Sequence, residues 1–154
     1  MYSTLDLVTP LLPEKKPRYL MGVGTPADLI NGIARGVDIF DCVLPTRLAR
    51  HNAAFSSEGR LNLMNAAFAR DPRPIDESCQ CYTCQTFTRA YLRHLIVAKE
   101  LLAGTLLSIH NLHALVQLVK DIRQMIINGT FEAIMPSLLE KWDNNAVRNY
   151  GNGE

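Results

Sequence analysis

Apolar residues in the first 50 positions form two short runs with a helical segment between them. The runs RYLMGVG (18–24) and VDIFDCV (37–43) each predict a buried strand. Residues 25–36 predict a helix, with Thr25 as its N-cap, Pro26 at the first helical position and Gly36 at its end. This order is typical of two parallel strands joined by a right-handed crossover. Because two strands and one helix cannot cover both faces of a parallel sheet, we expect further strands from another chain or from an N-terminal part.

Residues 1–17, before the first apolar run, contain three prolines and predict an irregular segment. After Arg50 the pattern of apolar residues changes. Residues 51–68 predict a hairpin that turns at Ser57, Glu58 and Gly59. Beyond the proline-rich stretch 71–78, helices are expected over 85–102, 108–128 and roughly 130–142, and the polar tail from Asn144 is expected to fray. In the segment 108–128, apolar residues three or four apart predict one buried face: Leu112, Leu115, Val116, Val119, Ile122 and Ile126.

Composition favours a soluble cytoplasmic protein. The formal net charge is +1 over 154 residues, so the overall field implies no nucleic-acid partner by itself. No positively charged segment followed by an apolar run opens the chain, and no stretch reads as long enough to span a membrane. The length suits one domain, although the strand pattern does not suit a self-contained one.

Three cysteines lie within six residues, at Cys79, Cys81 and Cys84. Neighbouring thiolates repel one another unless a cation holds them, so this spacing favours one metal ion over disulfides and fits a reducing compartment. Zn²⁺ takes four tetrahedral ligands, and three cysteines with one histidine are a standard structural set with no open position. A helix over 85–102 would carry His94 too far from the cysteines, at about 1.5 Å per residue. His110 and His113, expected near the start of the next helix, both remain candidates for the fourth ligand.

Asp41 directly follows the second strand. Catalytic carboxylates are often placed at the C-terminal ends of parallel strands, where they act as bases, metal ligands or nucleophiles. The alternative is a turn or helix cap, and Asp38 is expected to cap or pair at the start of the strand. Arg47 and Arg50 follow Pro45, which is expected to stiffen an exit loop, and two arginines beside a carboxylate suit an anionic substrate such as a phosphodiester backbone.

The glycines of LMGVGTPAD (20–28) lie between a strand and a helix N-terminus. Backbone N–H groups at such a turn can approach a ligand or phosphate closely. A tight strand-to-helix turn with no ligand is an equally good interpretation, because the spacing is not that of a full dinucleotide motif.

These motifs together resemble the C-terminal part of the tRNA-guanine transglycosylases, also called queuine tRNA-ribosyltransferases. YLMGVGTP, GVDIFDCVLPTR, the cysteine cluster, RAYLRHL and IHNL occur in the family's order, and the resemblance runs from about Arg18 to Trp142. It implies the end of a (β/α)₈ barrel, namely its last two strands, with an inserted zinc-binding subdomain and C-terminal helices. The implied division is 1–50 for the barrel end, 51–110 for the zinc subdomain and 111–154 for helices that pack back on the barrel.

The resemblance also assigns roles to residues. Asp41 matches the nucleophile that forms a covalent bond to the ribose of the tRNA, and Met21 and Gly22 match the base pocket. Cys79, Cys81, Cys84 and His110 match the ligands of one structural Zn²⁺, which selects His110 over His113. Two segments match tRNA-contacting regions: Gly22, Val23, Gly24, Thr25, Pro26, Ala27 and Asp28, and then Thr46, Arg47, Leu48, Ala49 and Arg50. Phe87, Tyr91 and His94 match the homodimer face.

The implied reaction exchanges guanine at the wobble position of tRNAs with a GUN anticodon for a 7-deazaguanine, prequeuosine-1 or queuine. The family's general acid/base aspartate lies upstream of any residue present here, so we expect a C-terminal fragment, a split-gene product or a truncated reading frame. Such a chain would be inactive alone and would act with the missing barrel half. The alternative is a non-catalytic tRNA-binding or dimerisation fragment.

Overall fold

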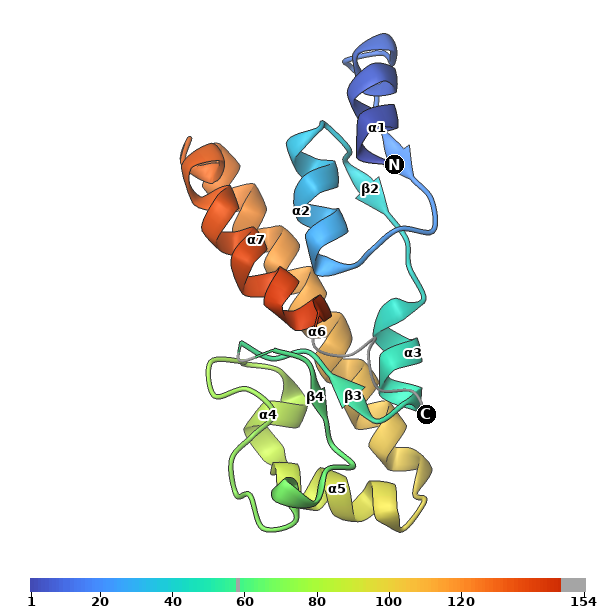
Figure 1. The fold of residues 1–154 in the computed structure, drawn as a ribbon, viewed down its shortest axis with the longest axis vertical. Helices are drawn as coiled ribbons and strands as arrows, with labels where there is room; N and C mark the ends of the chain where they lie inside the picture. Colours follow the sequence, from blue (N-terminus) through green and yellow to red (C-terminus); the bar gives the residue numbers. More distant parts are fainter. Residues whose placement is uncertain (58, 148–154) are drawn as a thin grey trace.

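The molecule is elongated, with two parts arranged along one long helix (Figure 1). The computed structural model describes residues 1–57 and 59–147. The first part holds α1 (Tyr2–Val8), η1 (Thr9–Leu11), β1 (Tyr19–Leu20), α2 (Pro26–Ala34) and β2 (Ile39–Phe40). After α3 (Leu44–Arg50), the second part holds β3 (Ala53–Ala54), β4 (Leu61–Asn62), η2 (Ala66–Phe68), α4 (Tyr82–Thr86) and α5 (Arg89–Val97). Helix α6 (Leu101–Ile127) runs along both parts, and α7 (Phe131–Val147) returns beside its upper half.

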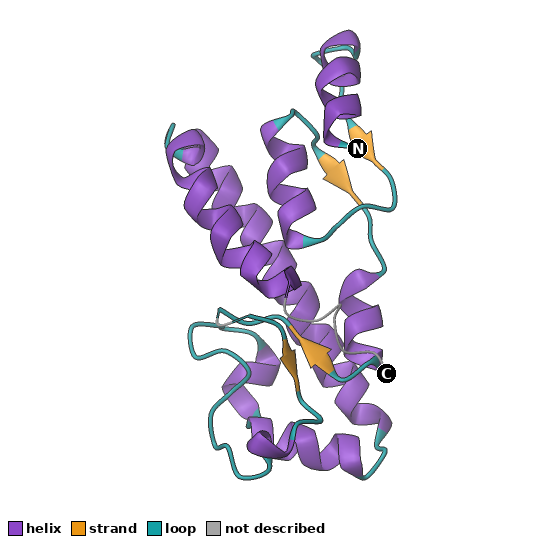
Figure 2. Cartoon of the chain, in the orientation of Figure 1, coloured by secondary structure: helices purple, strands orange, loops and turns teal. Residues whose placement is uncertain are grey.

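The strand–helix–strand order at the start of the chain is confirmed, but the two strands are not buried as expected, since Tyr19 and Ile39 are exposed. Strands β1 and β2 pair in parallel, with Tyr19 opposite Ile39. The side chain of Thr25 caps α2 by accepting from the N–H of Asp28, and Pro26 is the first helical residue. Gly36 has a φ of +82° just beyond the helix, a conformation that glycine adopts without steric cost. In Figure 2 the two strands lie on one side of α2 and each is short.

The predicted hairpin is also confirmed, since β3 pairs antiparallel with β4. Of its expected turn, Glu58 lies outside the described residues. Residues 1–17 are more regular than expected, because they include α1 and η1. An ion pair of 2.9 Å between Arg35 and Asp6 and a hydrogen bond of 2.7 Å from Tyr2 to Asp28 hold α1 against α2.

The single helix expected over 85–102 is wrong. The chain forms α4 and α5 with a break at Phe87 and Thr88, and a second break at residues 98–100 separates α5 from α6. Thr88 caps α5 by accepting from the N–H of Tyr91, and Lys99 has a φ of +59° at the second break. The following helix begins at Leu101, so His110 lies in its interior rather than near its start.

Helix α6 buries a different face from the one expected. Its fully buried residues include Leu107, His110, Asn111 and Ile122, whereas Leu112, Val116, Val119 and Ile126 are exposed. The prediction of a buried face was therefore right only for Leu115 and Ile122. Three of these exposed apolar residues lie together, since Leu112, Val116 and Val119 line a groove of about 430 Å³ beside β2.

By length and composition α6 is also able to cross a membrane, because it has 27 residues and contains an 18-residue stretch with a mean hydropathy of 1.3. The expectation that no stretch is long enough is therefore wrong. The buried side chain of Asn111 indicates that α6 packs in the interior of the folded protein. Its side chain accepts from the N–H of Phe55 and donates to the carbonyls of Pro45 and Ala53, each at 3.0 Å. A buried amide with three partners on other segments is typical of a core helix.

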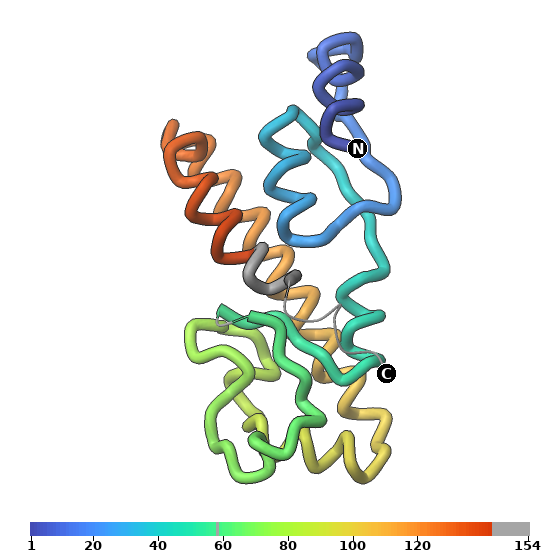
Figure 3. Tube along the Cα trace, viewed as in Figure 1, coloured from blue at the N-terminus to red at the C-terminus, as the bar shows by residue number. Residues whose placement is uncertain are grey.

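The helix after Asn128 and Gly129 is longer than expected, because α7 continues to Val147. The tail was expected to fray from Asn144, but its first four residues belong to α7, and residues 148–154 lie outside the described residues. Figure 3 shows how the trace of α7 turns at the upper end of α6 and runs back beside it toward the middle of the molecule.

Candidate metal centre and carboxylate site

Cys79, Cys81, Cys84 and His110 come together in the second part of the molecule. Their sulfur and nitrogen atoms all lie within 4.8 Å of one another. Nδ1 of His110 is 3.7 Å from the sulfur of Cys79, 3.5 Å from that of Cys81 and 3.2 Å from that of Cys84. A tetrahedral Zn²⁺ with Zn–S of about 2.3 Å and Zn–N of about 2.0–2.1 Å places sulfur and nitrogen about 3.5 Å apart. The four groups therefore fit one tetrahedral ion.

The local structure explains why these four groups converge. Cys81 is the N-cap of α4 and its sulfur accepts from the N–H of Cys84, so the first turn of that helix brings both sulfurs to one side. His110 is nearly fully buried on α6, and its Nε2 lies 2.7 Å from the carbonyl oxygen of Phe55. That contact requires the proton on Nε2, which leaves Nδ1 free as a ligand.

The pKa values of the cysteines and of His110 also favour the binding of a metal cation. Burial alone would lower the pKa of His110, but hydrogen bonds with Cys79 and Cys81 raise it to about 9. A hydrogen bond with Cys84 lowers the pKa of Cys81, whereas the same contact and burial raise the pKa of Cys84. Without a metal ion the thiols cannot all ionise together. A divalent cation would stabilise all three thiolates at once.

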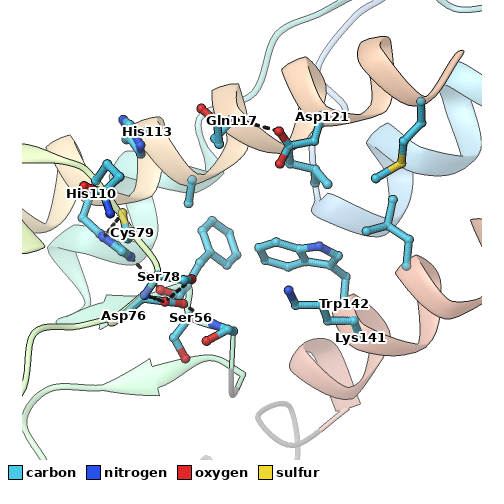
Figure 4. Close-up of a pocket in the computed structure, with 17 residues that line it drawn as sticks. Ser56, Asp76, Ser78, Cys79, His110, His113, Gln117, Asp121, Lys141 and Trp142 are labelled. Atoms are coloured by element: carbon cyan, nitrogen blue, oxygen red, sulfur yellow. Dashed lines mark hydrogen bonds between the residues drawn. The ribbon is translucent and has the colours of Figure 1, made fainter. Parts of the chain in front are cut away.

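Asp76 supports the loop that carries the cluster. Its carboxylate accepts from the backbone N–H of Ser57 and from both the N–H and the hydroxyl of Ser78. Burial alone would raise the pKa of Asp76, but these hydrogen bonds outweigh it and hold the pKa at about 2. Figure 4 shows Asp76 and Ser78 beside Cys79 and His110, at one end of a cavity of about 540 Å³.

The two other candidate histidines lie elsewhere. His113 is one turn further along α6 and lines the cavity of Figure 4 without joining the cluster. His94 is exposed on α5. The choice of His110 is thus consistent with the geometry, although the single helix that was expected to carry His94 away is absent.

The second group of polar residues lies at the end of β2. Asp41 directly follows this strand, as expected. Its Oδ1 accepts from the hydroxyl of Tyr19 at 2.7 Å and from the backbone N–H of Gly22 at 2.9 Å. These two hydrogen bonds, that from Tyr19 first, hold the pKa of Asp41 below its usual value. The carboxylate is therefore ionised near neutral pH, as a nucleophile requires.

Tyr19 is the residue of this group that the sequence patterns missed. Because Tyr19 pairs with Ile39, and Asp41 is two residues beyond Ile39, the side chains of Tyr19 and Asp41 lie on one face of the sheet. Met21, two residues after Tyr19, follows the same alternation and is exposed. In the sequence, only the alternation of Tyr19 and Met21 in the first apolar run indicated that Tyr19 lies on the face of the sheet that carries Asp41.

The other residues of the glycine segment are unequally accessible. Gly22 and Met21 are exposed, whereas Gly24 and Pro26 are buried. A Cβ at Gly24 would lie 2.4 Å from that of Cys42, so glycine allows the two segments to approach. Thr25 and Asp28 are engaged with each other, since the hydroxyl of Thr25 donates to the carboxylate of Asp28 at 2.7 Å. Asp38 pairs at the strand start as expected, accepting from the N–H of Arg18.

Arg47 and Arg50 lie on a helix rather than on the exit loop that was expected. Pro45 is among the first residues of α3, where a missing N–H costs nothing. Arg47 and Arg50 point to the exposed side of α3, Thr46 is half-buried, and Leu48 and Ala49 are buried against the core. The exposed arginines are thus the members of this segment that can reach an external anion.

Phe87 and Tyr91 form a stacked aromatic pair at the surface, with ring centroids 5.2 Å apart. They come from different segments, because Phe87 follows α4 as its C-cap and Tyr91 lies in α5. His94 follows Tyr91 on α5 and is exposed.

Comparisons with known proteins show which family the chain resembles. The family model described as queuine tRNA-ribosyltransferase matches residues 1–144. The chain is 53% identical over 142 residues to the queuine tRNA-ribosyltransferase of Symbiobacterium thermophilum, covering 92% of this chain and 36% of that protein. It is 54% identical over 151 residues to that of Streptococcus equi subsp. zooepidemicus, covering 97% of this chain and 40% of the relative. The chain therefore spans well under half the length of these relatives.

Proposed function

Because this chain belongs to the queuine tRNA-ribosyltransferase family, we propose that it supplies the nucleophile of a tRNA-guanine transglycosylase. The reaction replaces guanine at the wobble position of GUN-anticodon tRNAs with a 7-deazaguanine. The observation that carries the proposal is the carboxylate of Asp41, which lies at the C-terminal end of β2 and accepts from Tyr19 and Gly22. A carboxylate held in this way can attack C1′ of the ribose and form an ester with the tRNA.

The residues around Asp41 supply binding groups for the substrate. Gly22 donates its backbone N–H to the carboxylate, Met21 directly precedes Gly22, and both are exposed, which supports a role in the base pocket. Arg47 and Arg50 are exposed on α3, and guanidinium groups bind phosphates well. The segment from Gly22 to Asp28 completes the proposed tRNA contact, with the buried Gly24 and Pro26 shaping it rather than touching the RNA.

The metal of the Cys₃His site is proposed to be Zn²⁺. Cys79, Cys81, Cys84 and His110 would hold it with all four positions taken, so its role is structural. It would tie α4 and the cysteine loop to α6. The second part of the chain would then fold only with its metal.

The rest of the assembly is also a proposal. β1 and β2 would be the last two strands of a (β/α)₈ barrel, residues 51–110 a zinc subdomain, and the final helices a layer against the barrel, with α6 shared between them. Phe87, Tyr91 and His94 would form a homodimer contact, and the protein would act in the cytoplasm.

Labelled-guanine exchange into tRNA tests the catalytic proposal. The assay uses the chain alone and the chain combined with the upstream part that its longer relatives carry. We expect exchange only in the combination, and its loss in Asp41→Asn. Arg47→Ala is expected to raise the KM for tRNA about tenfold with little change in kcat, because a phosphate contact contributes to binding. A combination that exchanges guanine equally well with Asp41→Asn would contradict the assignment.

Metal analysis tests the zinc proposal. The purified chain is expected to contain about one Zn²⁺, and Cys81→Ala is expected to lose it, because removing one thiolate leaves a coordination position open. Cys42→Ala is the matched control, since Cys42 is a cysteine outside the cluster. Zinc retained by Cys81→Ala would refute the ligand set.

A further inference from the structure

We propose that Tyr19 and the backbone N–H of Gly22 fix Oδ1 of Asp41, so that Oδ2 attacks the ribose and the hydroxyl of Tyr19 assists the departure of the carboxylate afterwards. The inference rests on the proposed function of Asp41 as nucleophile. It adds a positioning residue and assigns different roles to the two oxygens of the carboxylate.

The geometry distinguishes the two carboxylate oxygens. Both hydrogen bonds end on Oδ1, from the hydroxyl of Tyr19 at 2.7 Å and from the N–H of Gly22 at 2.9 Å. These donors come from β1 and from the turn that follows it. Gly22 has a φ of +71°, a conformation that glycine adopts readily. Oδ2 is the oxygen that these donors leave available for attack.

The chemistry gives the donors a role in each half of the reaction. In the first half, a lone pair of Oδ2 forms a bond to C1′ while the C1′–N9 bond breaks. Its electron pair goes to guanine, which takes a proton from a general acid. Oδ1 becomes the ester carbonyl oxygen. In the second half, N9 of the incoming base gives its proton to the conjugate base of that acid and attacks C1′, the C1′–Oδ2 bond breaks, and its electron pair returns to the carboxylate.

The hydrogen bonds stabilise the free carboxylate more than the ester, because an ionised acceptor binds donors more strongly than a neutral one. They therefore make Asp41 a better leaving group. Tyr19 is placed to favour the second half of the reaction, in which negative charge returns to the carboxylate. The hydroxyl of Tyr19 and the N–H of Gly22 thus resemble an oxyanion hole that acts on the leaving group.

Two other charged residues of the described chain line the groove that contains Asp41. Asp38 and Lys120 line the same groove, from the start of β2 and from α6. Asp38 accepts from the N–H of Arg18 and so has a partner of its own. The hydrogen bond to Asp41 and, to a smaller extent, burial raise the pKa of Tyr19, as expected for a phenol that donates to a carboxylate.

A titration of Tyr19 tests the geometry without any catalysis. The pKa of Tyr19 is measured by NMR in the full chain with ¹³C-labelled tyrosine, the signal being assigned by its loss in Tyr19→Phe. We expect this pKa to fall in Asp41→Asn and to stay unchanged in Asp38→Asn, which removes a neighbouring carboxylate that does not contact Tyr19. An unchanged pKa in Asp41→Asn would overturn the proposal.

The kinetic part uses Tyr19→Phe in the chain combined with the upstream part of its relatives. Release of the tRNA from its covalent adduct is expected to slow about tenfold, the effect of losing one charge-assisted hydrogen bond. Formation of the adduct and the KM for tRNA should change much less, so the trapped adduct increases. A general loss of structure would instead slow both halves together, and that result would overturn the assigned role. Absence of any adduct with the unchanged protein would refute the proposed function. The titration would still test whether Tyr19 donates a hydrogen bond to Asp41, because it does not depend on catalysis.

Discussion

At the scale of single residues, buried polar groups give this molecule its specific arrangement. Asp76 accepts from Ser57 and Ser78 beside the cysteine cluster. Asn111 joins α6 to the hairpin and to Pro45 at the start of α3. Arg89, also buried, donates to the carbonyls of Pro74 and Ile75, each at 2.8 Å. Removing one such group leaves its partners buried without a hydrogen bond, which costs about 1–3 kcal/mol for each.

Asp76 provides a prediction on pH. Its pKa in the folded chain is about 2, below the ordinary value of 3.8, so the folded state favours the ionised form. Its contribution to stability, about 2 kcal/mol, is present above pH 4 and is lost as the pH falls toward 2. We expect the difference in unfolding free energy between the unchanged chain and Asp76→Asn to fall by about half between pH 7 and pH 3. Chemical denaturation at several pH values measures it.

Asp121→Asn is the matched control, because Asp121 lines the same cavity and accepts only from the side chain of Gln117 in the described structure. A difference for Asp76→Asn that stays constant with pH would contradict the prediction.

At the scale of elements, local signals were predictable and tertiary ones were not. Thr25, Pro26 and Gly36 set the ends of α2 through their own chemistry, and the spacing of the cysteines indicated a metal before any fold was known. The buried face of α6 was not predictable in the same way. Apolar residues lie on two faces of this helix, and periodicity cannot tell which of them meets the core. The contact of Tyr19 with Asp41 joins residues 22 positions apart, so it depends on the pairing of the strands.

Two glycines in helices test the packing of α2 and α6. A Cβ at Gly104 in α6 would meet no atom within 4 Å, whereas one at Gly32 in α2 would lie 2.7 Å from the ring of Phe40. Gly104→Ala is expected to stabilise the chain by about 0.5–1 kcal/mol, because alanine loses less backbone entropy in a helix. Gly32→Ala is expected to destabilise it by about 1–3 kcal/mol through overpacking. Equal shifts in thermal unfolding for the two variants would refute this account of the packing.

At the scale of the whole molecule, an apolar groove is exposed beside a two-stranded sheet. Ile39 on β2 and Leu112, Val116 and Val119 on α6 line it. One edge of a parallel pair and an apolar groove together favour association with further strands. The proposed barrel would cover this groove in the complete enzyme, and the surface pair of Phe87 and Tyr91 would add a second contact.

The chain by itself is therefore expected to form oligomers in sedimentation experiments. Val116→Glu should shift it toward the monomer, because a carboxylate in the groove opposes apolar contact. Leu101→Glu is the control, since Leu101 is 91% exposed and does not line the groove. A dilute monomer for the unchanged chain, or equal effects of the two variants, would contradict the role of the groove.

The most direct test of the central claim is the site of a covalent bond between this chain and tRNA. The chain is combined with the upstream part of its relatives, incubated with tRNA, and denatured to trap the adduct, which is then digested and mapped by mass spectrometry. We expect a ribose ester on the peptide that contains Asp41, and no adduct in Asp41→Asn. An adduct on any other residue, or one that persists in Asp41→Asn, would show that Asp41 is not the nucleophile.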